Sequence, residues 1–220
     1  MKKKEKKKLT KLEKWFRFMR RFYKYVARPF LPYKAYGHTD KFNDGPYIFV
    51  GNHKSVLDVI PAAMATDKAV HFMSKSELFQ KGISKWFTKK CECIPVSRDG
   101  TDVRAVMQAM KILKAGGIVC IFPEGTRNKT NKMFLPFKSG AAALAIKTRT
   151  PIVPIIQVNK IKFFKNSHFY YGEPFELTEF YDKKLNQEEI EKADEVLVKM
   201  LAELYLRLED ILKSNKKRKK

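Results

Sequence analysis

The chain has 220 residues, enough for one domain with a sizeable core and appended segments. Its 44% hydrophobic and 31% charged residues exclude an intrinsically disordered chain, and its net charge of +23 indicates a polyanionic partner, nucleic acid or an anionic membrane surface. The longest uncharged stretches have about ten residues, too few for a membrane-spanning helix of roughly 18 apolar residues, and no secretory signal is expected.

The first segment, residues 1–36, contains 14 Lys and Arg and two acids. Within it we expect an amphipathic helix from Leu9 to about Phe30, where prolines end it. One arc of this helix is apolar and aromatic and the other is basic, which is typical of a helix lying in a membrane interface. The apolar arc also suits packing on a protein core, but nine of the 28 aromatic residues lie in residues 15–36, and this crowding favours membrane contact.

Short apolar runs then alternate with amphipathic stretches. The alternation predicts an α/β fold, with a mostly parallel or mixed central sheet flanked by helices. The expected strands are 47–51, 70–74, 94–96, 118–122, 152–158 and 169–172, and the expected helices are 55–66, 101–115, 139–147 and 186–213.

The end of the chain is basic again. Residues 213–220 hold six Lys and Arg and no acid, whereas residues 37–212 hold 26 basic and 21 acidic residues. We therefore divide the chain into a basic tail with an amphipathic interfacial helix (1–36), an α/β domain (37–212) and a basic C-terminal tail (213–220). Three cysteines cannot all pair internally, which favours a reducing, cytosolic setting.

The first candidate for chemistry follows the strand 47–51. His53 suits a general base, since its pKa lies near neutrality, and Asp58 suits the carboxylate that fixes its tautomer. Two residues five apart on one regular helix lie about 140° apart, so the pair meets only if His53 precedes the helix and Ser55 caps it. The alternative is a helix-capping pair of Ser55 and Asp58 beside an ordinary loop histidine.

A second candidate, Phe122-Pro123-Glu124-Gly125-Thr126-Arg127, follows the strand 118–122, at the edge where α/β proteins bind ligands. Gly125 permits a tight turn, and the guanidinium of Arg127 suits a phosphate. Ten residues on, the segment Phe137-Lys138-Ser139-Gly140 opens a helix whose free N–H groups favour an anion. The alternative is an ordinary strand-to-loop turn with a surface arginine.

Other polar residues carry weaker signals. Arg98 follows the short strand 94–96 in a loop, where a lone arginine is usually a solvated charge. Cys91 and Cys93 have no second Cys or His pair at zinc-like spacing, so neither a metal nor a cofactor is expected.

Four short blocks follow one another along the chain: Asn52-His53-x-Ser55-x-x-Asp58, Ile94-Pro95-Val96-Ser97-Arg98, Phe122-Pro123-Glu124-Gly125-Thr126-Arg127 and Val153-Pro154-Ile155-Ile156. In sequence and order they resemble the glycerolipid acyltransferase family, most closely its bacterial 1-acyl-sn-glycerol-3-phosphate acyltransferases. The resemblance covers about residues 45–175, and its six-residue third block is the most specific.

The resemblance implies transfer of a fatty acyl group from a thioester, on coenzyme A or acyl carrier protein, to the hydroxyl of lysophosphatidic acid. His53 would be the base and Asp58 its orienting partner. The phosphate site of the acceptor would comprise Arg98, Glu124, Gly125, Thr126, Arg127 and Lys138. The family pattern has an acidic residue before the arginine of the second block, where this chain has Ser97.

This implied function makes a membrane the expected partner of the amphipathic helix, because the acceptor and the product are both membrane lipids. We expect a peripheral or monotopic enzyme on the cytoplasmic side of an anionic membrane, with no specific nucleic acid partner. Two alternatives stay open at this point: an acyltransferase for another acceptor, such as glycerol-3-phosphate or another lysophospholipid, and a nucleic-acid-binding protein.

Overall fold

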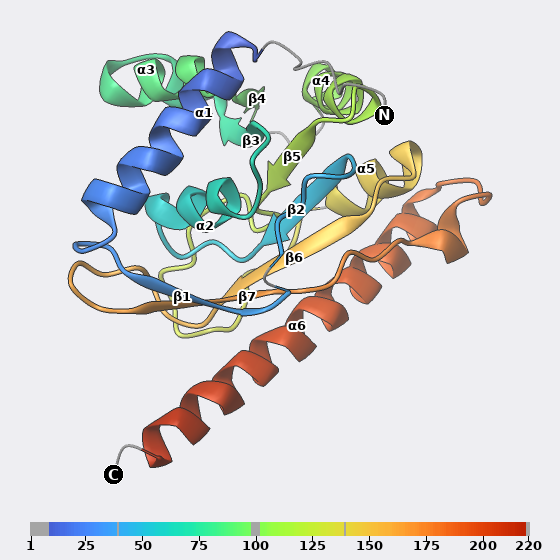
Figure 1. Cartoon of the computed structure of the whole chain (residues 1–220). Helices are drawn as coiled ribbons and strands as arrows, with labels where there is room; N and C mark the ends of the chain where they lie inside the picture. The colour runs from blue at the N-terminus through green and yellow to red at the C-terminus, as the bar shows by residue number, and fades with distance from the viewer. Residues whose placement is uncertain (1–8, 39, 98–101, 139, 219–220) are drawn as a thin grey trace, which may run out of the picture.

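A computed structural model describes residues 9–38, 40–97, 102–138 and 140–218. Its centre is a seven-stranded sheet in the order β1-β7-β6-β2-β5-β3-β4 (Figure 1). The strands are β1 (Tyr33–Gly37), β2 (Tyr47–Gly51), β3 (Val70–Lys75), β4 (Ile94–Val96), β5 (Ile118–Ile121), β6 (Ile152–Gln157) and β7 (Ser167–Tyr171).

Helices connect the strands and cover both faces of the sheet (Figure 1). The α-helices are α1 (Lys11–Phe22), α2 (Val59–Met64), α3 (Gly82–Lys90), α4 (Val103–Lys114), α5 (Ala141–Thr148) and α6 (Gln187–Lys217). Among the described residues, no helix is both long enough and apolar enough to cross a bilayer.

The sheet is mixed, as the sequence predicted. Strands β4, β3, β5, β2 and β6 run parallel to one another, whereas β7 is antiparallel to β6 and β1 is parallel to β7. The carboxyl ends of β2, β5 and β6 therefore meet at one edge of the sheet, where the loops that follow them lie close together.

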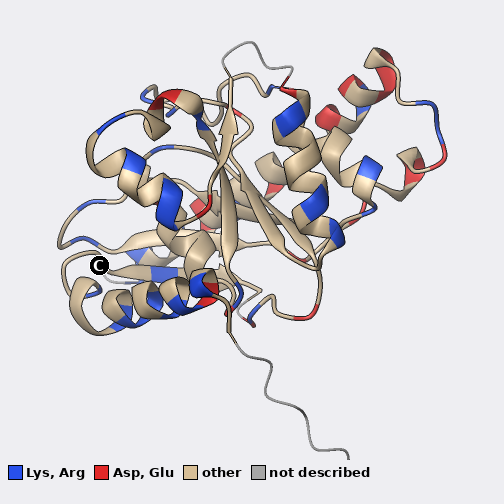
Figure 2. Cartoon of the chain, turned by 90° about the horizontal axis from the view of Figure 1, so that it is seen from above, with Lys and Arg blue, Asp and Glu red and all other residues tan. Residues whose placement is uncertain are grey.

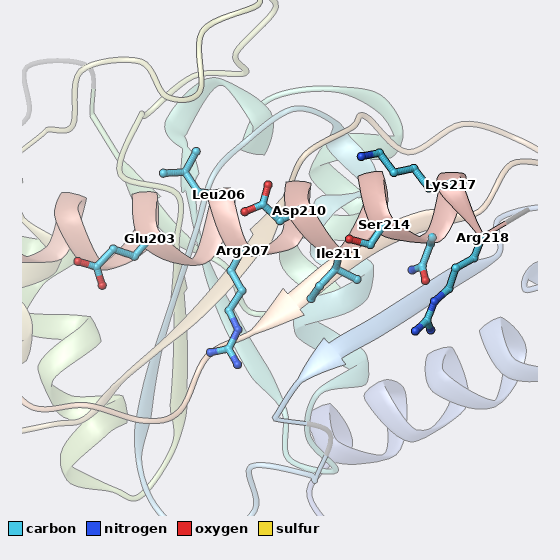
Figure 3. A pocket seen from close by; sticks show the side chains of 9 residues that line it. Glu203, Leu206, Arg207, Asp210, Ile211, Ser214, Lys217 and Arg218 are labelled. Carbon is cyan, nitrogen blue, oxygen red and sulfur yellow. The ribbon is translucent and has the colours of Figure 1, made fainter. Parts of the chain in front are cut away.

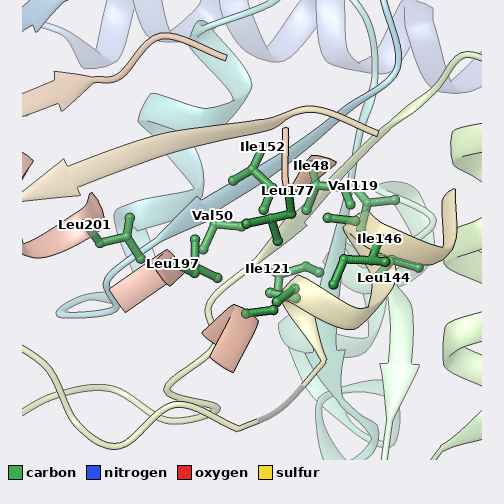
Figure 4. Close-up of a cluster of buried hydrophobic side chains, with 14 of the residues drawn as sticks. Ile48, Val50, Val119, Ile121, Leu144, Ile146, Ile152, Leu177, Leu197 and Leu201 are labelled. Carbon is green, nitrogen blue, oxygen red and sulfur yellow. The ribbon is translucent and has the colours of Figure 1, made fainter. Parts of the chain in front are cut away.

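Two hydrophobic clusters, one on each face, hold the layers together because successive strand residues point to opposite sides. Ile48 and Val50 of β2 pack towards α5 and α6, with Leu197 and Leu201 of α6 fully buried in the same cluster (Figure 4). Phe49 of β2 faces the cluster that includes residues of α1 and α2.

Every strand and helix expected in residues 37–212 is present, with ends that differ by up to four residues. The pattern did not predict α3 or β1. β1 is an edge strand with half-buried and exposed side chains, so it lacks the apolar run that signals a strand, and its pairing with β7 defines it. It straddles the boundary expected at 36/37.

The amphipathic helix expected from Leu9 to Phe30 is formed by α1 and a π-helical continuation, Tyr23–Ala27. Part of its apolar arc packs on the body, with Phe16 only 3% exposed. Arg20 anchors it further by donating to backbone carbonyl oxygens of the segment between α2 and β3, at 3.0 Å to that of Lys68 and 2.5 Å to that of Asp67. The helix is thus a layer of the domain as well as an amphipathic surface.

The remaining apolar side chains of this helix are exposed. Phe18 is 56% exposed and stacks on Trp15, which makes an edge contact with Trp86 of α3 at 5.4 Å between ring centroids. Lys and Arg lie along most of the helix, with one acidic residue near its start (Figure 2). The arc therefore divides into a strip that packs on the sheet side and a strip that faces solvent.

This division predicts unequal effects of two phenylalanine substitutions. Phe16→Ala removes a buried ring and should lower the free energy of unfolding by about 3 kcal/mol. Phe18→Ala, the matched control on the exposed strip, should lower it by less than about 1 kcal/mol. Urea denaturation followed by circular dichroism measures both, and equal losses would show that α1 does not pack as described.

Candidate functional site

The candidate residues gather at the carboxyl edge of the sheet. β2 ends at Gly51 and leads directly into Asn52 and His53, and the neighbouring parallel strand β5 ends at Ile121 and leads into the segment 122–127. Two sequence blocks 70 residues apart are therefore neighbours in space, because their strands pair.

His53 and Asp58 are in direct contact, with 2.9 Å between the His53 Nδ1 and the Asp58 Oδ2. The contact is possible because His53 lies in the loop before the short 3₁₀ turn Val56–Asp58. The carboxylate is 2% exposed, whereas the imidazole side chain is 20% exposed. The histidine is thus held from inside the protein while part of its ring remains open to solvent.

The same carboxylate oxygen also caps the start of the helical segment. Asp58 Oδ2 accepts hydrogen bonds from the backbone N–H groups of Lys54 and Ser55, both at 2.7 Å, and the Ser55 hydroxyl accepts from Leu57 N–H. The capping pair and the histidine partner, two alternatives from the sequence, are therefore one arrangement. In this arrangement the His53 Nδ1 carries the ring proton and donates it to Asp58. The other ring nitrogen, Nε2, keeps its lone pair and is the one that can accept a proton.

Phe122 holds the imidazole from the side. The two rings stack with 4.5 Å between their centroids and 17° between their planes. Since Phe122 is the first residue after β5, the strand itself positions this support. The stack and the carboxylate together restrict the orientation of the histidine ring.

Glu124 binds the protein's own backbone. It is 3% exposed, and its Oε1 accepts from His53 N–H at 2.7 Å while its Oε2 accepts from Leu135 N–H at 2.8 Å. Burial raises the pKa of this carboxyl, and the two backbone hydrogen bonds act in the opposite direction. The residue therefore ties the histidine loop to the segment before α5, although the sequence assigned it to the acceptor's phosphate.

A further clamp joins the ends of β2 and β6. Asn52 donates from its amide to the Gln157 carbonyl at 2.8 Å, and Gln157 N–H donates to the Asn52 Oδ1 at 3.0 Å. Asn128 N–H donates to the His53 carbonyl at 2.6 Å. Sequence reasoning missed the roles of Gln157 and Asn128, because neither carries a local signal that it contacts the histidine loop.

The cationic candidates lie beside this clamp. Gly125 has φ +60°, and a Cβ added there would lie 3.1 Å from the Lys138 side chain, so the lysine lies across the glycine. Lys138 N–H donates to the Pro123 carbonyl at 2.9 Å, which joins the two segments. Thr126, Arg127 and Lys138 are exposed. Arg98 lies outside the described residues.

Two hollows among the described residues lie elsewhere. One, of about 980 Å³, runs along the C-terminal half of α6 between Glu203 and Arg218 (Figure 3). The other, of about 630 Å³, lies between α6 and the strands β1 and β7. Neither is lined by His53 or Arg127, so the candidate site is defined by side-chain contacts at the edge of the sheet.

Comparison with known proteins identifies the family of this chain. The model of the Acyltransferase family matches residues 33–158, more than half of the chain, and the chain belongs to that family. The match begins at the first residue of β1 and contains every candidate site residue.

Curated relatives carry one shared name. A 1-acyl-sn-glycerol-3-phosphate acyltransferase of Bacillus subtilis is 34% identical over 125 residues, 55% of this chain and 60% of that protein. A chloroplastic enzyme of the same name from Brassica napus is 31% identical over 150 residues, 63% of this chain and 43% of that protein. The chain thus spans about two fifths to three fifths of these relatives.

A solved structure has a similar fold. The 1-acyl-sn-glycerophosphate acyltransferase PlsC of Thermotoga maritima superposes with a TM-score of 0.56 at 24% identity, covering 88% of this chain and 78% of that one. The mixed sheet flanked by helices, which the sequence predicted, is confirmed.

The two hydrogen bonds of Glu124 lead to a structural prediction. Glu124→Gln keeps the size of the side chain but leaves one acceptor oxygen for two backbone donors. We expect the free energy of unfolding to fall by about 1–3 kcal/mol. Amide hydrogen exchange should quicken in peptides containing His53 or Leu135. Glu195→Gln, on an exposed face of α6, is the control, and unchanged exchange in Glu124→Gln would contradict the assigned contacts.

Proposed function

We propose that this protein transfers a fatty acyl group from an acyl thioester to the free hydroxyl of 1-acyl-sn-glycerol-3-phosphate, giving phosphatidic acid. The observation that carries the proposal is the buried carboxylate of Asp58 on the Nδ1 of a half-buried His53, at the edge of the sheet where Arg127 and Lys138 are exposed. The names of the curated relatives support the choice of acceptor.

In the proposed reaction, the His53 Nε2 takes the proton of the acceptor hydroxyl as its oxygen attacks the thioester carbonyl. The imidazolium is stabilised by the Asp58 carboxylate on the other nitrogen. Collapse of the tetrahedral intermediate breaks the carbon–sulfur bond, and the imidazolium returns the proton to the leaving thiolate. A thioester is already an activated acyl group, so we propose no metal or cofactor and leave the donor as acyl-CoA or acyl carrier protein.

The phosphate of the acceptor is proposed to bind Arg127 and Lys138, with Arg98 as a third cation. The backbone at Gly125 and Thr126 would supply N–H groups to the phosphate oxygens. Glu124 has a different role in this proposal, since its oxygens are already bonded and a carboxylate repels a phosphate. It positions the histidine loop relative to the cationic residues.

The proposed acceptor is a membrane lipid, so we propose that the protein works as a peripheral protein on the cytoplasmic side of an anionic membrane. The exposed strip of α1 supports this, because it presents aromatic rings beside Lys and Arg residues.

An acceptor panel tests the function. Purified full-length protein with a radiolabelled acyl donor, supplied on coenzyme A and on acyl carrier protein, should transfer label to 1-acyl-sn-glycerol-3-phosphate. His53→Ala should lose at least about 1,000-fold in kcat with its circular dichroism unchanged, since the general base is gone. Transfer only to glycerol-3-phosphate or to lysophosphatidylcholine would overturn the proposed acceptor, and a near-normal rate in His53→Ala would overturn the base.

The phosphate site predicts a second kinetic effect. Arg127→Ala removes a charge-assisted hydrogen bond and should raise the KM for lysophosphatidic acid at least about tenfold, with the KM for the acyl donor unchanged. Lys147→Ala, an exposed cation in the last turn of α5, is the matched control and should change neither. An unchanged acceptor KM in Arg127→Ala would contradict the phosphate role.

A further inference from the structure

The loop between β6 and β7 exposes two adjacent phenylalanines. Phe163 is 63% exposed and Phe164 is 72% exposed, on a tight turn closed by the bridge between Lys162 and Lys165. Exposed single apolar residues are common, but two neighbouring aromatic rings at the tip of a loop present a concentrated apolar surface to water. Figure 1 shows this loop projecting beyond the sheet beside the chain that enters β1.

The backbone at this tip is in an unfavourable conformation. Phe164 has φ +58°, in the left-handed region that a bulky residue rarely adopts. A glycine would adopt it without strain, so the position carries an aromatic ring at the expense of stability. Strain of this kind, found where a side chain is exposed, indicates a role for that side chain outside the fold.

The tip continues the exposed strip that follows α1. Phe164 N–H donates to the Phe30 carbonyl at 2.7 Å, and the two rings make an edge contact with 5.6 Å between centroids. The loop thereby extends an apolar surface whose other exposed members are Phe18, Phe22, Tyr25, Val26 and Phe30.

The charged residues around the tip indicate which kind of partner binds there. Lys160, Lys162 and Lys165 flank the two rings and are exposed. Aromatic rings at the centre with ammonium groups around them suit a bilayer interface, where the rings enter the acyl boundary and the lysines meet lipid phosphates. A soluble anionic partner would meet the lysines but would leave the rings in water.

We propose that residues 160–165 form a second membrane anchor, which inserts Phe163 and Phe164 into an anionic bilayer beside the exposed strip of α1. The anchor begins three residues after Gln157, which is clamped to Asn52, the neighbour of His53, so a short segment connects it to the candidate site. Two adjacent contacts with the bilayer would fix the orientation of the domain, and with it that of His53, relative to the lipid surface. The inference rests on the proposed action on a membrane lipid.

The test uses the full-length chain with Phe163→Ser and Phe164→Gly combined, a change that also relieves the left-handed strain and so preserves folding. Sedimentation with sucrose-loaded vesicles of phosphatidylglycerol and phosphatidylethanolamine should give a partition coefficient at least about tenfold lower than that of the unaltered chain. Val103→Ser with Met107→Ser removes two exposed apolar side chains of α4, 68% and 64% exposed, and should not change it.

Lys162→Gln with Lys165→Gln should weaken binding to these vesicles and leave binding to phosphatidylcholine vesicles unchanged. An unaltered partition coefficient in the phenylalanine double variant would overturn the anchor. Vesicle sedimentation measures membrane binding without catalysis, so it tests the proposed anchor whether or not the protein transfers acyl groups. Transfer to a short-chain, water-soluble lysophosphatidic acid decides the proposed function without a membrane.

Discussion

The arrangement at the sheet edge depends on one buried carboxylate. Asp58 accepts from the His53 ring and from two backbone N–H groups with a single oxygen, so it begins the helix and orients the imidazole at once. Burial of a carboxylate is costly without hydrogen bonds, and the three bonds that Oδ2 accepts all come from the loop that carries the histidine, whereas Oδ1 has no hydrogen-bond partner among the described residues. The start of the helix and the orientation of the ring therefore depend on the same oxygen.

Parts of the chain that are distant in sequence hold that loop in place. Glu124, after β5, binds the His53 backbone, and Gln157, at the end of β6, binds Asn52. Because β2 lies between β5 and β6, the loop is held from both neighbouring strands. The exposed cations Arg127 and Lys138 lie on segments that follow the same sheet edge, so the strands beneath them set their position relative to the imidazole.

The N-terminal helix has two different apolar faces. Its Phe16 side completes a hydrophobic cluster of the domain, and its Phe18 side leaves aromatic rings exposed beside basic residues. A helix docked in this way has a fixed orientation relative to the site, which a freely tethered helix would not have. The exposed strip and the Phe163–Phe164 tip then belong to one rigid surface.

Local patterns predicted the α/β class, the order of the strands and helices apart from β1 and α3, and the four blocks that carry the candidate chemistry. These features are local. Apolar runs, helical periodicity and short spacings such as that of His53 and Asp58 depend only on residues that are close together in the chain. The tertiary structure alone decided that β1 joins the sheet, that Glu124 bonds to backbone and that the loop at Phe164 meets Phe30. Each of these contacts joins residues far apart in the chain, and strand pairing and burial, which no local pattern encodes, bring them together.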